Sequence, residues 1–267
     1  MPQATLKNGA TLNWGEAGAG KPLVLVHGSP GDGRAWGRVM SHLPTTRRML
    51  TPDLPGYGGS DTLPSEIERR TEAMAEAIDQ LIDSQGEDVW LSGHSYGANV
   101  ALHAALSSKQ RVRSVVLFEP VFMRALELAG EREELAKTRA FFETYLARVD
   151  ADDRDAIGLM VDFWFGPRSY ARLPANVREF LKGAAHKNAT DVRASFAEQV
   201  LAEELSAFDK PVLIVCGGAS PPVTETIARA LGGMLPAAEV KTIPGATHAM
   251  LDTHAQAVAQ MIDQHCR

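Results

Sequence analysis

Four short, continuous apolar runs constrain the fold of this chain more than any other feature. Runs without polar alternation are typical of strands that are buried on both faces of a parallel sheet. Segments with helical spacing separate them, one at about residues 66–82 and another starting near residue 96. This alternation predicts an α/β fold with a mostly parallel, doubly wound sheet. The four runs are residues 23–26, 89–91, 115–118 and 212–215.

The N-terminal residues depart from this pattern. Asn8 and Gly9 lie between two short strand-like runs and predict a hairpin turn, so we expect an antiparallel ribbon at the edge of the sheet. Residues 15–21 match the spacing of a phosphate-binding loop as far as Lys21. However, Pro22 stands where that loop needs Ser or Thr, and a strand follows instead of a helix. A turn between two strands is the better interpretation, and no nucleotide cofactor is expected.

The charge distribution argues against a nucleic-acid partner. The formal net charge is −6 and the basic residues are scattered, so no positive field would attract phosphates. The nearest approach to a basic cluster is the pairs Arg47-Arg48 and Arg69-Arg70, which we expect on the solvated surface. No His-Glu-x-x-His or Cys-x-x-Cys motif occurs, and the eight histidines are dispersed, so no metal is expected either.

The two cysteines favour a reducing, cytoplasmic compartment. Cys216 ends an apolar run and is predicted to be a small core residue, whereas Cys266 lies at the C-terminus, which we expect to be frayed. A disulfide between them is possible but is not the favoured interpretation. The first residues show no apolar segment typical of a signal peptide. Since no stretch approaches about 18 apolar residues, we expect no membrane span.

The strand–helix alternation breaks between about residues 121 and 206. We expect residues 1–120 and 207–267 to form the core, and residues 121–206 to form a helical lid inserted after the sixth strand. The plainer alternative is an ordinary helical subdomain with its own core. A lid of this composition would favour a small-molecule substrate with an apolar acyl or aryl part. Its aromatic residues are Phe122, Phe141, Phe142, Tyr145, Phe163, Trp164, Phe165 and Tyr170.

The pentapeptide Gly-His-Ser-Tyr-Gly at residues 93–97 follows one apolar run and precedes a helical segment. Gly-x-Ser-x-Gly in this strand–turn–helix context indicates a nucleophile, here Ser95, on a tight turn whose neighbours must be small. The helix that follows directs its N-terminus at the site, where an oxyanion can be stabilised. The alternative is a glycine-rich turn that matches the motif by chance.

Three further motifs accompany this pentapeptide: His-Gly at residues 27–28, Asp-Leu-Pro-Gly-Tyr-Gly-Gly-Ser at residues 53–60 and Gly-Ala-Thr-His at residues 245–248. With them the chain resembles the α/β-hydrolase superfamily of esterases, dehalogenases and C–C hydrolases over nearly its whole length. The resemblance implies the α/β-hydrolase fold and an oxyanion hole formed by the backbone N–H groups of Ser29 and Tyr96. It also implies that His27 and the loop at residues 53–60 are structural.

His248 is the predicted general base because of its position. It follows the last apparent strand, residues 239–243, and a turn at Pro244-Gly245. The order of nucleophile, acid and histidine along the chain is the α/β-hydrolase order. His94 is the rival because it adjoins Ser95, but a side chain next to the nucleophile on a tight turn points away from it.

The acid departs from the family's usual pattern. Where the family most often carries it, after the run at residues 212–216, residues 217–222 contain no carboxylate. Some relatives carry the acid one strand earlier, and Glu119 stands there, at the edge of the sheet where ligands bind. The alternative is a surface glutamate before a proline turn. Glu225 is the next candidate, whereas Asp252 and Asp209 are expected to face away from the site.

Together these residues predict a serine hydrolase that cleaves a carboxylic ester through an acyl-enzyme, with Ser95, His248 and Glu119 as the triad. Serine at the turn argues against dehalogenase and epoxide hydrolase chemistry, which in the family uses a carboxylate nucleophile. Hydrolysis of a C–C or thioester bond is the closest alternative. A non-catalytic scaffold that binds a small molecule is the alternative from another class, and the missing acid at its usual place is the feature that favours it.

Overall fold

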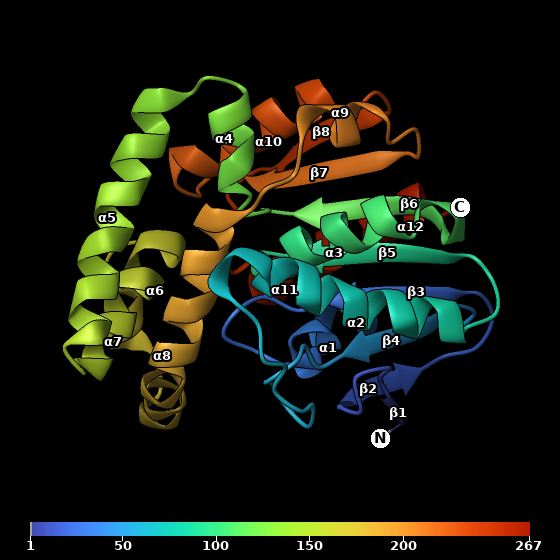
Figure 1. The fold of residues 1–267 in the computed structure, drawn as a ribbon, viewed down its shortest axis with the longest axis horizontal. Coiled ribbons are helices and arrows are strands. Elements are labelled where there is room, and N and C mark those ends of the chain that lie inside the picture. Colours follow the sequence, from blue (N-terminus) through green and yellow to red (C-terminus); the bar gives the residue numbers. More distant parts are fainter. Residues whose placement is uncertain (1) are drawn as a thin grey trace.

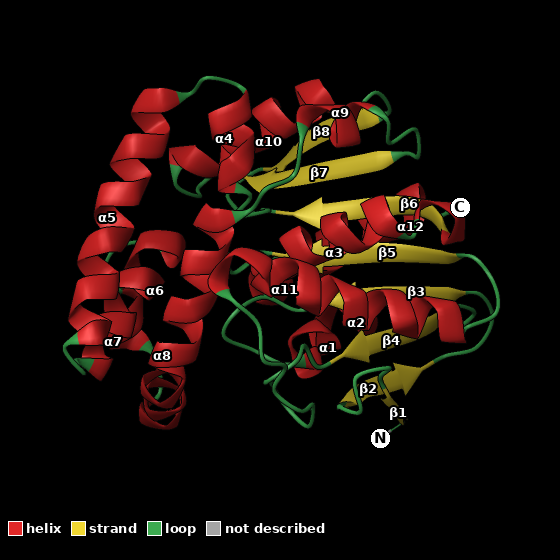
Figure 2. Ribbon diagram, in the orientation of Figure 1, coloured by secondary structure: helices red, strands yellow, loops and turns green. Residues whose placement is uncertain are grey.

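A computed structural model describes residues 2–267 of the protein. An eight-stranded sheet runs through its middle with helices on both faces (Figures 1 and 2). The strand order is β1-β2-β4-β3-β5-β6-β7-β8. The strands are β1 (Gln3–Thr5), β2 (Thr11–Ala17), β3 (Pro22–Val26), β4 (Arg48–Pro52), β5 (Val89–His94), β6 (Val112–Phe118), β7 (Val212–Gly217) and β8 (Ala238–Ile243).

The sheet confirms the predicted mixture of one antiparallel edge and a parallel centre. Strands β1 and β2 form the expected hairpin around Asn8-Gly9, with Gly9 at φ +87°, and β2 pairs antiparallel with β4. All pairs from β4 through β3 to β8 are parallel. Residues 18–21 form the turn from β2 to β3, as expected for the glycines there. The structure also contains strand β4, which the apolar runs did not indicate.

Successive residues of the central strands face opposite sides of the sheet, so two hydrophobic cores form. Val24 and Val26 of β3 face one core, and Leu23 and Leu25 face the other. The first core is covered by α2 (Arg70–Ser84), α3 (Tyr96–Ser107) and α10 (Pro222–Met234), and the second by α1 (Gly37–Met40) and α12 (Ala255–His265). Shorter pieces lie in the connections: α11 (Met250–Thr253), η1 (Gly33–Trp36), η2 (Ile67–Arg69) and η3 (Lys109–Arg111).

The segment between β6 and β7 is helical, and in Figure 1 its helices α5 to α8 stand beyond the carboxyl ends of the parallel strands. Their apolar side chains are continuous with the core that contains Val24 and Val26. A search of residues 2–267 finds every helix too short or too polar to cross a membrane. The helices are α4 (Met123–Leu128), α5 (Arg132–Asp150), η4 (Arg154–Ala156), α6 (Ile157–Phe165), α7 (Ser169–Arg172), α8 (Ala175–Ala197) and α9 (Ala202–Ser206).

Both cysteines are buried and free. Cys216 is a core residue at the end of β7, as predicted. The expectation of a frayed C-terminus around Cys266 was wrong, because this side chain is fully buried in the second core. The preceding helix α12 packs Val258 and Ile262 against the sheet and carries Cys266 inward with them.

Candidate active site

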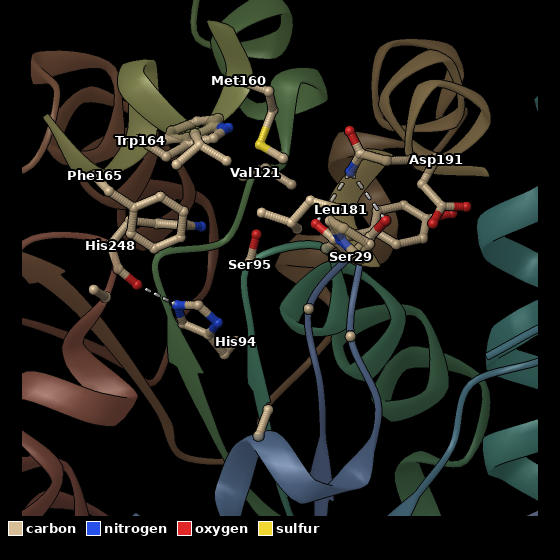
Figure 3. Close-up of a pocket in the computed structure, with 18 of the residues that line it drawn as sticks. Ser29, His94, Ser95, Val121, Met160, Trp164, Phe165, Leu181, Asp191 and His248 are labelled. Atoms are coloured by element: carbon tan, nitrogen blue, oxygen red, sulfur yellow. Dashed lines mark hydrogen bonds between the residues drawn. The ribbon is translucent and has the colours of Figure 1, made fainter. Parts of the chain in front are cut away.

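Ser95 lies on the turn from β5 to α3, in a backbone conformation that residues other than glycine rarely adopt, φ +57° and ψ −130°. The two glycines of the motif allow the turn to close. A Cβ atom at position 93 would lie 2.3 Å from Gly97 O, and one at position 97 would lie 2.1 Å from His27 O. The Ser95 N–H donates to Phe118 O at 2.9 Å, which ties the turn to β6. Its hydroxyl points into a cavity (Figure 3).

His248 and Glu119 are in direct contact. The Nδ1 of His248 lies 2.5 Å from Glu119 Oε2, and both side chains are buried. Because a carboxylate oxygen accepts, Nδ1 carries the proton and Nε2 remains free to accept one. Among the described residues, no hydrogen bond joins His248 to the Ser95 hydroxyl. Such bonds are often long before substrate binds.

Glu119 follows β6 and is held from both sides. Its Oε1 accepts the Gly217 N–H at 2.6 Å, and its own N–H donates to Val215 O at 2.8 Å. Its backbone has φ +46°, a second strained residue next to Ser95 in the sheet. None of the other three candidate carboxylates is bonded to His248: Glu225 is exposed on α10, and Asp209 pairs with Lys109 at 3.2 Å. The expectation that Asp252 faces away from the site was wrong, because it lines the cavity, where it pairs with Arg38 at 3.3 Å.

His94 is buried below the nucleophile and has a different partner. Its Nε2 donates to the backbone carbonyl of His248 at 3.0 Å, and the two rings lie 4.7 Å apart. Burial and the neighbouring His248 hold the pKa of His94 well below its ordinary value, so the ring is neutral. His94 therefore supports the loop that carries His248.

Aromatic rings of α6 enclose the His248 ring. Trp164 stacks on it with centroids 4.8 Å apart and an interplanar angle of 25°, and Phe165 meets it edge-on at 5.7 Å. Figure 3 shows both rings beside His248 at the cavity wall. The helical insertion thus contributes directly to the surroundings of this histidine.

The two residues predicted for the oxyanion hole lie in segments that adjoin Ser95. Tyr96 is the first residue of α3, and Ser29 lies in the loop after β3. A Cβ atom at Gly28 would lie 2.9 Å from Ser95 Cβ, so this loop passes directly beside the nucleophile. The structure pairs neither the Ser29 nor the Tyr96 N–H with an acceptor among the residues it describes. Both are therefore available to an oxyanion.

His27 and Asp53 serve the loops around the site. His27 Nδ1 donates to Gly28 O at 2.8 Å, while its Nε2 accepts the Leu54 N–H at 2.9 Å. The Asp53 carboxylate accepts the N–H groups of Gly33 and Gly59 at 2.8 and 2.9 Å. With both ring nitrogens occupied, His27 holds two loops together and is not free for proton transfer.

The cavity above Ser95 has a volume of about 610 Å³. Most of its wall is apolar and comes from the helical insertion. Ser29, Asn188 and Asp191 form a polar portion beside the loop after β3. The apolar lining from the insertion is Val121, Met123, Phe142, Met160, Val161, Trp164, Phe165, Leu173, Val177, Phe180, Leu181, Val192 and Phe196.

Sequence reasoning missed the polar residues of α8. Asn188 and Asp191 are only 2% and 1% exposed, and Asp191 accepts from Arg70 Nε at 2.6 Å. The expectation that Arg70 is solvated was therefore wrong, and Arg47, paired with Asp263 at 2.9 Å, is also largely covered. In both cases an acidic partner from a distant segment neutralises the charge. The available signal was helical spacing, since positions 188, 191 and 195 lie on one face of α8.

A parallel sheet with a serine at its strand-to-helix turn and a histidine–carboxylate pair beside it defines an α/β protein built for hydrolytic chemistry. A family model described as the alpha/beta hydrolase family matches residues 23–261, and the chain belongs to this family.

Individual relatives agree with this assignment. Lipase LipV of Mycobacterium tuberculosis is 33% identical over 152 residues, which are 56% of this chain and 54% of the lipase. The 2-hydroxymuconate semialdehyde hydrolase of a Pseudomonas species is 33% identical over 113 residues, which are 41% of this chain and 40% of that protein. The chain thus matches about half or less of each relative's length. A thermophilic esterase from Thermogutta terrifontis has a similar fold, with a TM-score of 0.72, 24% identity and coverage of 98% of this chain and 96% of that chain.

Proposed function

We propose that the protein is a serine hydrolase that cleaves carboxylic esters by a Ser95–His248–Glu119 triad. The observation that carries the proposal is the 2.5 Å contact between His248 Nδ1 and Glu119 Oε2 beside Ser95 at the floor of the cavity. A base held in this tautomer can remove the proton of a serine hydroxyl. The same contact supports catalysis over non-catalytic binding, because it supplies the acid that is missing after β7.

The proposed reaction has two halves. Ser95 Oγ attacks the ester carbonyl carbon while its proton moves to His248 Nε2, and the imidazolium is stabilised by Glu119. The N–H groups of Ser29 and Tyr96 hold the oxyanion, and the alcohol leaves with the proton from His248. Water then attacks the acyl-enzyme and gives a proton to His248, and His248 returns this proton to Ser95 Oγ as the bond to the acyl group breaks and the acid leaves. A donor of this kind contributes about 2.7–4 kcal/mol to transition-state stabilisation.

The cavity supports an apolar acyl or aryl group in the substrate. A volume of about 610 Å³ lined mainly by apolar side chains suits a small molecule that loses its hydration on entry. The similar proteins include a lipase and a 2-hydroxymuconate semialdehyde hydrolase. Hydrolysis of an ester, a thioester or a C–C bond by a serine begins with attack on a carbonyl carbon, so the same site would serve the proposal and its C–C or thioester alternative.

Covalent labelling tests the nucleophile. A fluorophosphonate should modify Ser95 alone, and Ser95→Ala should lose the label and roughly 10⁴-fold or more of the activity on p-nitrophenyl esters. Ser92→Ala is the matched control, because Ser92 lies on β5, three residues before Ser95, and is fully buried. A label on another residue, or one that survives Ser95→Ala, would contradict the assignment. If Ser95 is labelled but no ester is hydrolysed, the result would favour a C–C or thioester bond as the bond that the protein cleaves.

A further inference from the structure

A continuous series of buried and half-buried hydrogen bonds joins helix α8 of the insertion to the loop after β3. Asn188 Nδ2 donates to both Ser29 O and Ser29 Oγ at 3.1 Å. Ser29 Oγ lies 2.9 Å from the Tyr57 hydroxyl, which in turn donates to Asp191 Oδ2. Figure 3 shows the bonds to Ser29 beside the cavity, with Asp191 behind them. Both ends of the series lie on α8, and its middle is the candidate oxyanion residue.

The acidic end of this series sets the direction of its protons. Asp191 accepts from Arg70 Nε at 2.6 Å and from Tyr57, so the single proton of Tyr57 is committed to the carboxylate. Ser29 must then donate its hydroxyl proton to Tyr57 and accept from Asn188. At the far end, Asn188 Oδ1 lies 2.8 Å from the Tyr145 hydroxyl, which also lies 3.3 Å from Ala185 O. Rotation of the Tyr57 or Asn188 side chain would leave buried polar atoms without partners.

Burial makes this arrangement rigid. Tyr57, Asn188 and Asp191 are at most 5% exposed. Burial and the nearby Asp191 raise the pKa of Tyr57 well above its ordinary value, so the hydroxyl keeps its proton. Lys187, the residue before Asn188, adds a second attachment, because its Nζ donates to Gly56 O in the same loop as Tyr57. Helix α8 is therefore bound both to the loop after β3, which contains Ser29, and to the loop at residues 53–60, which contains Tyr57.

We propose that Tyr57 and Asn188 are positioning residues of the oxyanion hole, which hold Ser29 so that its backbone N–H faces the developing oxyanion. The inference rests on the proposed function. Bonds to the hydroxyl and the carbonyl of Ser29 fix its side chain and the peptide that follows it, and so restrict rotation of the residue that carries the N–H. A preorganised donor stabilises charge without reorganising during the reaction. The insertion thus takes part in the chemical step as well as in forming the cavity wall.

The test removes single bonds from the series. Tyr57→Phe deletes the hydroxyl that accepts from Ser29, Asn188→Asp deletes the amide donor, and Ser29→Ala keeps the backbone N–H but removes its attachment. Each should lower kcat on a short p-nitrophenyl ester about tenfold with KM nearly unchanged, less than the 10²–10³-fold cost of deleting a donor outright. Affinity for a boronic acid, whose tetrahedral adduct places an oxygen in the hole, should fall in parallel.

A double variant separates positioning from general damage. Ser29→Ala and Tyr57→Phe remove two ends of one bond, so the pair together should cost little more than either alone. Tyr170→Phe is the control, because its hydroxyl meets Asp155 at 3.5 Å on the exposed side of the insertion and should leave kcat unchanged. If Tyr57→Phe fails to fold, Ser29→Ala alone decides, since it deletes one hydroxyl.

The outcomes separate the two proposals. A wild-type protein without ester turnover contradicts the proposed function before any variant is compared. An active wild type whose three variants keep the kcat of Tyr170→Phe overturns the positioning role. A rise in KM at constant kcat also overturns it, because it would assign these residues to substrate binding.

Discussion

The sheet and the helical insertion place their functional side chains by different physical means. In the sheet, Ser95 and Glu119 each follow directly on a strand, and the strained turn itself determines where the side chain points. In the insertion, Trp164 of α6 and Asn188 of α8 project from helices, and their position depends on packing and hydrogen bonds to other segments. The comparison suggests that reacting atoms reside where the backbone is most constrained, while helices adjust what surrounds them.

The largest effect should come from the sheet side. Glu119→Gln keeps the shape of the side chain but removes its charge, so His248 loses the group that fixes its tautomer. We expect kcat to fall by roughly 10²–10⁴-fold, up to the loss seen for the analogous change in a serine protease. Glu225→Gln is the matched control, because Glu225 is an exposed residue of α10. Full activity of Glu119→Gln would show that the acid lies elsewhere.

The sheet side is also the part of the site that could be predicted from the sequence. Strand ends, glycines and the order of motifs along the chain are local features, and they indicated Ser95, Glu119 and His248, which the structure brings together. The buried state of Arg70 and Cys266 could not be predicted locally. Each depends on what another segment packs against it: Asp191 in α8 for the arginine and the sheet face for the cysteine.

The next effect should come from the insertion. Trp164→Ala removes the ring that stacks on His248, so kcat should fall about tenfold, an effect of the order that misplacing a catalytic group can produce. The preferred ester chain should also lengthen, because the cavity grows. Initial rates on p-nitrophenyl esters from acetate to decanoate measure both.

Phe142→Ala is the variant to compare with Trp164→Ala. Phe142 packs on Trp164 at 5.8 Å, is 2% exposed and does not contact His248. It should cost about 3–5 kcal/mol of stability, as large-to-small core changes do, and alter chain preference without a direct loss in kcat. If both variants change only the melting temperature, the aromatic residues form the core of a subdomain and do not select the substrate.

The smallest effect should come from Asp79, which lies far from the cavity. It should change the melting temperature and leave kcat unchanged. Burial raises the pKa of Asp79 on α2 to about 6, although the hydroxyls of Ser107 and Ser108 donate to it. The unfolded chain binds this proton with a pKa of about 3.9. The folded state therefore binds the proton more tightly, and the associated stability is present below about pH 4 and is lost as the pH rises through about 6.

Asp79→Asn removes this titration. The melting temperature of the wild type relative to the variant should fall between about pH 4 and 7 and then level off, with kcat unchanged. Asp88→Asn is the control, since this carboxylate is 44% exposed and lies outside α2. A difference that does not vary with pH would mean that the pKa of Asp79 is the same in the folded and the unfolded chain.

Two residues with positive φ lie side by side at the ends of neighbouring strands, and their backbone strain lowers the stability of the fold. Ser95 at φ +57° and Glu119 at φ +46° follow the paired strand ends His94 and Phe118, so both strained positions are adjacent in the sheet. Glycine would relax either one, at the loss of the side chain. A glycine at position 95 would therefore exchange the proposed nucleophile for a less strained turn, so we expect a more stable protein without activity. At position 119 the relief of strain is opposed by the loss of the bonds to Gly217 and His248.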